Sequence, residues 1–440
     1  MQFPRLALAA QSAMAGSALI VLLTAGGAVA SEDPRRPAES NPAAAALAPP
    51  VEELVARALA NAPSIAARRA RVTAAQAAAK AADVLQDPMV EFEVRDAGFP
   101  KWTLGEDPMS MIGATIRQPL VSKGRKTGRS AAALAEVNVR LADADAAARE
   151  LAAAMRAEYG RLYAVDRERA ILKDSQEVAR LLAETAMARY ASGESDQAAV
   201  LRAQLERTRL AERAVDLEAD RWTLVVAINR LLNQPPDTPL GEVRELPEQA
   251  SRALPPEGVA ESAATHAPSV SVRMADVAAA ERRVDLLKED LRPNWTIGGS
   301  FFWQGGVNRV VSVTVGVDWP WRKDRNQQPL IAASERELDA ARLDLADAAA
   351  AMGAEAARLA VEIRRAEDQI ARYRSALLPQ SSAALDAARA SYLGGRGDFA
   401  SVLDEFRRWT EIRVELARRE ASRFAARAQL DSLVSKEPRS

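Results

Sequence analysis

The chain has 440 residues, more than one ordinary domain needs, and its formal net charge is -1. This balance gives no basic field of the kind that gathers nucleic acid, so a nucleic-acid-binding protein is not expected. Cysteine is absent and histidine occurs once, which excludes disulfide scaffolds, cysteine nucleophiles, histidine-based triads and multi-histidine metal centres. We therefore predict no catalytic residue, no cofactor-binding residue and no metal ligand.

The first 30 residues have the order of a secretory signal peptide. Arg5 precedes an apolar stretch that includes residues 18–23, and Ala28-Val29-Ala30 supplies small residues at a cleavage site. A retained membrane anchor is the alternative, but the uninterrupted apolar part is shorter than the roughly 20 residues a spanning helix needs. Residues 31–50 are rich in Ala, Pro and Ser and predict an extended leader.

The remainder of the chain contains the same sequence pattern twice. Residues 58–65 resemble residues 263–270, and the proline-flanked segments 88–119 and 293–320 occupy matching places. The period, roughly 200 residues, is too long for a solenoid and indicates an internal two-fold repeat. We predict repeat 1 at 51–234, a proline-rich linker at 235–256 and repeat 2 at 257–435.

Long helices are predicted within each repeat. Hydrophobic residues make up 48% of the chain but aromatic residues only 5%, so alanine, a strong helix former, accounts for much of the apolar content. Heptad spacing indicates coiled-coil seams, and Lys123 to Tyr190 as one helix would extend on the order of 100 Å. In repeat 2, Pro379 is expected to kink or restart the matching helix. The heptad positions are Leu210, Leu217, Leu224 and Leu231, then Ile331, Leu338, Leu345, Met352 and Leu359.

Each proline-flanked segment alternates between apolar and polar residues, which predicts a β-hairpin of two strands. The apolar positions are Val90, Phe92, Val94, Ile112, Ile116, Trp295, Ile297, Phe301, Trp303, Val311, Val313, Val315 and Val317. Strands of roughly nine to ten residues cross a bilayer when tilted. Five tryptophans, Trp102, Trp295, Trp303, Trp319 and Trp321, lie in or beside the hairpins, as in an aromatic girdle. A half-buried soluble hairpin remains the alternative.

Strands in lipid must close into a barrel, because an open edge would leave backbone groups without water. The four strands of one chain cannot close into a barrel by themselves. An open conduit requires at least three chains, with about twelve strands in all. The predicted fold class is thus mainly α, a long helical barrel joined to a transmembrane β-barrel shared by three chains. Residues expected to face the lumen are Glu91, Glu93, Arg95, Thr314 and Asp318.

Several short motifs lie in order along the two repeats. They are Asn61-x-Pro63, the run Pro119 to Lys126 leaving the first hairpin, Leu378-Pro379-Gln380 ahead of the second turn, and the turns Arg189-Tyr190-x-x-Gly193 and Ser391-Tyr392-x-x-Gly395. In this doubled order, the chain from Val51 to Val434 resembles the TolC-like family of outer-membrane efflux proteins. Within that family it looks most like the heavy-metal efflux branch.

The resemblance implies a homotrimeric channel-tunnel in the outer membrane, with its helical part in the periplasm. Such a channel serves tripartite efflux or type I export and passively passes metal ions, drugs or other small molecules, without a cofactor. Its partners are a periplasmic adaptor, an inner-membrane pump and outer-membrane lipid. The resemblance also implies that the adaptor docks at the tips 190–196 and 392–398, through Tyr190, Gly193, Asp196, Tyr392, Gly395 and Asp398.

Family channels close near the second tip through carboxylates whose positions here hold Ser401 and Asp404. The family's first carboxylate is therefore replaced by a serine, which leaves a single acidic ring that Glu405 could support. Arg202 occupies the matching place in repeat 1, and we hypothesise that it pairs with Asp404 of a neighbouring helix and latches the closed state.

Two other classes of protein stay open at this point. A periplasmic adaptor or coiled-coil scaffold would need its strands in a soluble β domain. An enzyme is disfavoured by the missing nucleophile and metal sets. Charged runs along the helices, such as Arg167-Glu168-Arg169, are expected to be solvated faces.

Overall fold

The computed structural model describes residues 47–247, 256–306 and 308–434. The signal peptide expected at 1–30 and most of the leader expected at 31–50 lie outside these residues. The described residues belong to one compact unit, which begins at Ala45.

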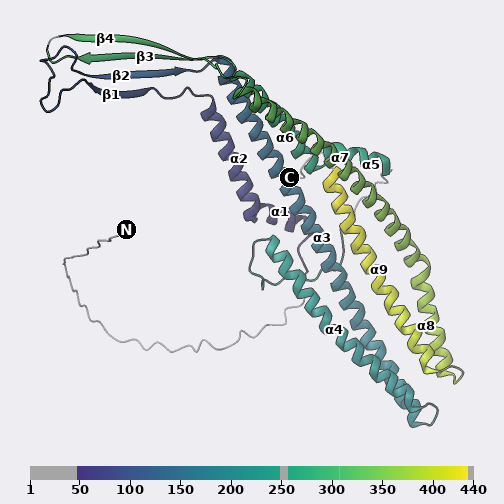
Figure 1. Ribbon diagram of the computed structural model, residues 1–440. Coiled ribbons are helices and arrows are strands. Elements are labelled where there is room, and N and C mark those ends of the chain that lie inside the picture. Colours follow the sequence, from purple (N-terminus) through teal and green to yellow (C-terminus); the bar gives the residue numbers. More distant parts are fainter. Residues whose placement is uncertain (1–46, 248–255, 307, 435–440) are drawn as a thin grey trace, which may run out of the picture. The chain divides into compact units, whose positions relative to one another are not determined.

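Helices and strands follow the same order twice along this unit (Figure 1). The first half contains α1 (Val51–Asn61), α2 (Pro63–Ala82), β1 (Met89–Arg95), β2 (Met111–Leu120), α3 (Lys123–Ala191) and α4 (Gln197–Leu231). The second contains α5 (Pro256–His266), α6 (Pro268–Glu289), β3 (Asn294–Trp303), β4 (Arg309–Asp318), α7 (Gln327–Arg372), α8 (Leu378–Leu393) and α9 (Phe399–Val434). In each half, two shorter helices precede a pair of strands, and a long helical hairpin follows.

Prolines set the helix breaks. Pro63 and Pro268 each occupy the first turn of their helix, where the missing N–H costs no hydrogen bond. Pro379 lies in the first turn of α8, directly after a π-helical turn at Tyr373–Leu377. A proline cannot donate a hydrogen bond to the carbonyl four residues earlier, and its ring clashes with that carbonyl. The π-helical turn, which is wider than an α-helical turn, lies at this clash. The restart expected near Pro379 is present.

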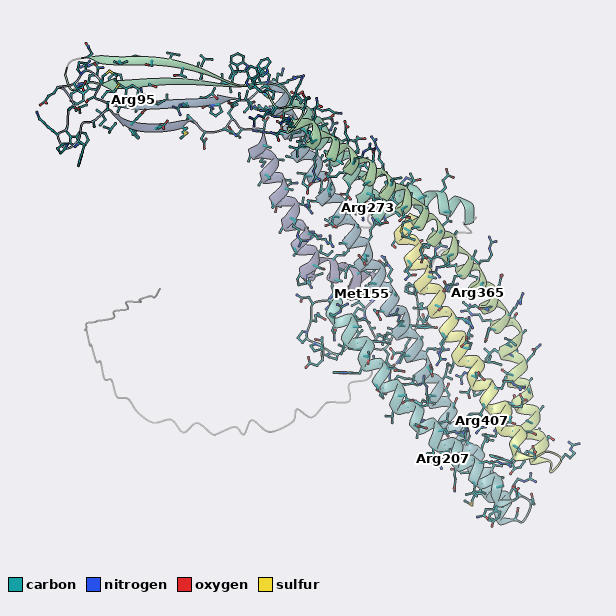
Figure 2. All side chains as sticks on the ribbon, in the orientation of Figure 1. Arg95, Met155, Arg207, Arg273, Arg365 and Arg407 are labelled. Atoms are coloured by element: carbon teal, nitrogen blue, oxygen red, sulfur yellow. The ribbon has the colours of Figure 1, made fainter. Side chains whose placement is uncertain are left out.

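Helix α3 is the centre of the helical packing. It contacts α2, α4, α6 and α9 along its 69 residues, which correspond to about 100 Å. Met155 and Leu162 of α3 are fully buried in a cluster with Phe424 of α9, and Gly160 leaves room for that ring. Figure 2 shows Met155 in the middle of the helices.

Several of the predicted heptad positions face the helical interior. Leu210 and Leu217 of α4 are buried, as are Ile331, Leu338 and Leu359 of α7. None of the helices in the described part of the chain is long and apolar enough to cross a membrane.

The four strands form one antiparallel sheet in the order β1-β2-β3-β4 (Figure 1). Strand β2 pairs with β3, so the two hairpins are joined edge to edge, and the Thr115 hydroxyl donates to Ser300 across this junction at 2.9 Å. The outer edges of β1 and β4 have no partner strand within the sheet of the described residues.

The register separates the side chains of the sheet into two faces. On one face, a row of paired residues crosses the sheet from Glu93 of β1 through Gly113 to Phe302. A second row on the same face runs from Glu91 through Thr115 and Ser300 to Ser312 of β4. The other face is almost wholly apolar and exposed. It carries Val90, Phe92, Val94, Ile112, Ile116, Trp295, Ile297, Phe301, Trp303, Val311, Val313, Val315 and Val317.

Candidate functional site

Two tight turns end the helical hairpins, one between α3 and α4 and one between α8 and α9. Gly193 and Gly395 have positive φ angles of 78° and 68°, a conformation that costs other residues roughly 1–2 kcal/mol. Asp196 caps α4 by accepting from the Ala199 amide at 3.0 Å, and Asp398 accepts from the Ser401 amide at 2.9 Å. The two tips named from the sequence are thus built alike in their backbones.

The two tip tyrosines differ. Tyr190 is 46% exposed, whereas Tyr392 is 5% exposed and packs edge-on against Phe399. Arg189 of the first tip lies over the Tyr392 ring, 4.7 Å from its centroid, and donates to the Tyr392 carbonyl. Ser195 lies 3.2 Å from the Tyr392 hydroxyl. The first tip therefore holds the second through Tyr392, while Tyr190 is partly exposed.

Sequence reasoning did not find this contact between the tips. It treated Tyr190 and Tyr392 as equivalent, although Arg precedes the first and Ser precedes the second. Arginine at 189 is long enough to reach the other tip, whereas serine at 391 is short and lies beside Gly397 of its own turn. The difference between these two preceding residues was the available signal.

Of the residues named for a pore constriction, Ser401, Asp404 and Glu405 lie near the N-terminus of α9 and Arg202 lies near the N-terminus of α4. Hydrogen bonds from the Ser401 hydroxyl and amide, with a smaller effect of the nearby Arg202, hold the pKa of Asp398 below its usual value. Asp398 therefore stays ionised further into acid and keeps its capping bond there. The Asp404 side chain is 71% exposed, 3.9 Å from Arg407, and Glu405 pairs with Arg408 at 3.2 Å.

Arg202 and Asp404 are not brought together within one chain. The ion pair formed by Asp404 among the described residues is with Arg407. Arg407 also binds Glu206 of α4 at 2.6 Å, and Figure 2 shows Arg407 among the helices toward the tips. A latch between Arg202 and Asp404 thus requires a second chain.

A ladder of ion pairs joins α3, α4 and α9. Glu168 of α3, 9% exposed at its side chain, accepts from Arg213 of α4 and Arg418 of α9, each at 2.8 Å. Glu206 of α4 accepts from Arg407 of α9. The expectation that residues 167–169 form a solvated face is wrong for Glu168, because α3 has neighbours on several sides.

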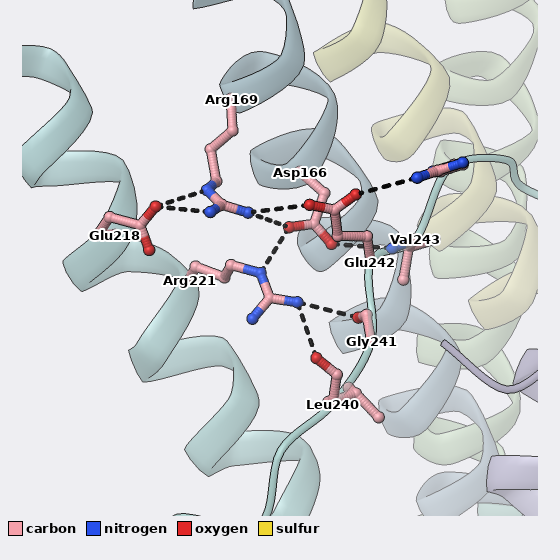
Figure 3. Close-up of polar contacts among 9 residues, drawn as sticks. Asp166, Arg169, Glu218, Arg221, Leu240, Gly241, Glu242 and Val243 are labelled. Carbon is pink, nitrogen blue, oxygen red and sulfur yellow. Dashed lines mark hydrogen bonds and ion pairs between the residues drawn. The ribbon is translucent and has the colours of Figure 1, made fainter. Parts of the chain in front are cut away.

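Asp166 is the centre of a second polar network (Figure 3). Its carboxylate accepts from Arg221 Nε at 2.7 Å and from the Val243 amide at 2.9 Å, and Arg169 lies 3.4 Å away. Arg221 also donates to the carbonyls of Leu240 and Gly241, both at 2.9 Å. The network fastens the segment after α4 to α3 and α4.

The described residues offer little that could bind a small molecule. Within them, no group of three or more histidine, aspartate or glutamate side chains is arranged to hold a metal ion. A hollow of about 290 Å³ lies between α4 and α9, and its lining includes the paired residues Glu206, Arg407 and Arg418. These side chains serve helix packing.

Comparisons with known proteins agree with this architecture. Residues 54–234 match the family model described as outer membrane efflux protein. The outer-membrane channel OprN is 18% identical, with a TM-score of 0.76 over 88% of this chain and 90% of that one. VceC from Vibrio cholerae is 16% identical, with a TM-score of 0.74 over 88% and 97%. CusC, whose structures concern transmembrane channel formation, is 15% identical, with a TM-score of 0.75 over 88% and 92%.

Comparison with curated protein sequences finds no match. The fold of this chain is that of the outer-membrane efflux channels, mostly helical with a small antiparallel sheet. The predicted resemblance to the TolC-like outer-membrane efflux proteins is confirmed by the family match and this shared fold. The structural similarities to OprN and CusC are about equal, so the heavy-metal branch stays a prediction.

Proposed function

We propose that this chain is one protomer of a trimeric channel-tunnel in the outer membrane. It would conduct, without chemistry of its own, substrates delivered by an inner-membrane pump and a periplasmic adaptor, in tripartite efflux or type I export. The match of residues 54–234 to the outer membrane efflux protein family and the fold shared with solved channels support this function. The cargo, whether metal ions, drugs or other small molecules, is not part of the proposal.

The exposed apolar face of the sheet is the observation that carries the proposal. Phe92, Val311 and Val313 are 83%, 74% and 76% exposed, and they belong to one continuous face. A contiguous apolar face of this kind marks contact with lipid or with another protein. The opposite face carries the ion pairs Glu91–Arg117 and Glu93–Arg95, which suit a water-filled lumen.

The two sheet edges supply the argument for several copies. In lipid, unpaired backbone groups of β1 and β4 would each cost several kcal/mol, so the edges must pair. Pairing β1 of one copy with β4 of the next closes a barrel, and three copies give about twelve strands, enough to leave an open interior. The long helices of the three copies would then continue the conduit.

The helical tips are the proposed docking sites for the adaptor. Tyr190 is 46% exposed at the first tip, so nearly half of its surface is available to a partner. Gly193, Asp196, Gly395 and Asp398 shape the turns, and Tyr392 joins them to each other. We assign the docking contact mainly to the first tip for this reason.

The constriction is proposed at Asp404, with Ser401 and Glu405 beside it and Arg202 as its partner on a neighbouring chain. The exposed Asp404 carboxylate has only a distant partner in its own chain, which leaves it able to form a ring across copies. In planar bilayers, Asp404→Ala is expected to raise single-channel conductance at least about twofold. Asp237→Ala, which removes an exposed carboxylate in the turn after α4 and outside the constriction, is the control and should change the conductance little. Unchanged conductance in Asp404→Ala would reject the constriction while leaving the channel itself in place.

The alternative, a periplasmic adaptor or coiled-coil scaffold, is not favoured. Such a protein would keep its strands in a soluble β domain with one face covered. Here no described element packs over the apolar face, since Phe92, Val311 and Val313 remain mostly exposed. The shared fold with outer-membrane channels points the same way.

A further inference from the structure

Exposed aromatic residues follow the apolar face of β4 past the end of the strand. Val315 and Val317 point to the apolar side, and Trp319 and Trp321, directly after the strand, are 57% and 85% exposed. Trp295 of β3 lies opposite Val317 in the register and is 48% exposed. Three tryptophans therefore lie at the end of the sheet from which α7 departs.

Three cations follow these tryptophans directly. Arg322, Lys323 and Arg325 are exposed, and within the described residues none of them takes part in an ion pair, while Asp324 is the single carboxylate among them. The turn has a defined backbone, because the amides of Arg325 and Asn326 both donate to the Arg322 carbonyl at 3.0 Å. The turn thus presents its positive charge beside the aromatic rings.

The matching junction in the first half of the chain is different. Only two residues separate β2 from α3, and neither is aromatic. Of the cations there, Arg125 is buried against Asp290 at 2.8 Å, Lys126 pairs with Asp83 at 3.6 Å, and Lys123 is exposed. The combination of tryptophans with three exposed cations on one turn is therefore found at the second junction and not at the first.

We propose that the turn of residues 319–326 binds anionic phospholipid headgroups in the membrane leaflet on the helical side of the sheet. This inference rests on the proposed function, because it requires the sheet to lie in a bilayer. Tryptophan rings prefer the headgroup level, and arginine and lysine just beyond it attract anionic lipid phosphates. An aromatic anchor and a cationic cluster on one turn supply both contacts.

The test uses the full mature chain reconstituted in vesicles of phosphatidylethanolamine and phosphatidylglycerol. After gentle extraction, the lipids that remain bound are counted by mass spectrometry. We expect phosphatidylglycerol to be enriched several-fold over its share in the vesicle, and we expect high salt to reduce this enrichment. The triple variant Arg322→Gln, Lys323→Gln and Arg325→Gln is expected to lose most of it.

A matched control removes the same charge elsewhere. Arg364, Arg365 and Arg372 are exposed cations on α7, away from the sheet, and their replacement by glutamine should leave the enrichment unchanged. If the chain inserts and conducts but retains both lipids equally, the inference is wrong and the proposed function stands. The same holds if the triple variant keeps the phosphatidylglycerol enrichment. Failure of the unmodified chain to insert would overturn the proposed function, and the inference with it.

Discussion

At the scale of single residues, Asp166 of α3 joins its own helix to α4 and to the segment that follows α4. Its side chain is 3% exposed and accepts from Arg221, from the Val243 amide and more weakly from Arg169. Sequence alone could not select it, because Asp166 and Glu168 belong to one dense run of charges whose burial depends on which helices surround α3. The same reason explains the wrong expectation for Glu168.

Replacing Asp166 by alanine should destabilise the protein strongly. The change removes one acceptor from Arg221 and Arg169, which keep other acceptors, and leaves the Val243 amide without one. We expect a loss of about 3 kcal/mol in the free energy of unfolding, the low end for a broken buried ion pair. Urea unfolding of the detergent-solubilised protein measures it. Glu177→Ala is the control, because the Glu177–Arg180 pair is solvent-exposed and should contribute no measurable stability. Equal midpoints for the two variants would contradict the role given to Asp166.

The two tip tyrosines give a second matched pair of variants. Tyr392→Ala removes a buried ring that contacts Phe399 and Arg189, so the second tip should open more often. We expect trypsin to cleave after Arg396 on the order of ten times faster in this variant, since cleavage follows local opening. Tyr190→Ala should leave that rate unchanged and instead weaken cross-linking to the adaptor. Faster cleavage in Tyr190→Ala and weaker cross-linking in Tyr392→Ala would show that the roles given to the two tyrosines are wrong.

At the scale of elements, the sequence predicted the strands well because their pattern has a period of two and prolines flank them. The alternation also predicted which side chains share a face, as Phe92 and Val313 illustrate. The pairing of β2 with β3 was not predicted, because these strands are far apart in sequence and neither has a distinctive partner pattern. The helix break near Pro379 follows from proline chemistry, whereas the π-helical form of the turn before it was not predicted.

Two neighbouring positions of β4 test the assignment of the faces. Val313 and Thr314 lie near the middle of the strand and point to opposite sides. Lysine at a lipid-facing site near the bilayer centre costs about 2–4 kcal/mol, so Val313→Lys should lower the stability of the vesicle-embedded protein by that amount. Thr314→Lys should change it little, because that side chain lies on the opposite face, which we propose lines the lumen. Urea unfolding from vesicles compares them, and a larger loss for Thr314→Lys would reverse the faces.

At the scale of the whole molecule, one chain is incomplete. Within the described residues, its sheet has two open edges and a bare apolar face, and Arg202 is not paired with Asp404. Composition, repeats and strand patterns could predict a channel assembled from several copies, because each repeat supplies only one hairpin. They could not place Asp404 against Arg202, because that contact depends on how neighbouring chains meet.

Closure by three copies is the central claim, and one measurement tests it most directly. The mature chain is expressed, the membranes are fractionated, and the protein is cross-linked in the membrane before its gel mobility is compared with and without heating. We predict recovery with the outer membrane, a mobility that shifts on heating, and cross-linked species that stop at three chains. Recovery as a monomer in the soluble periplasmic fraction, or a ladder that passes three chains without a limit, would contradict it.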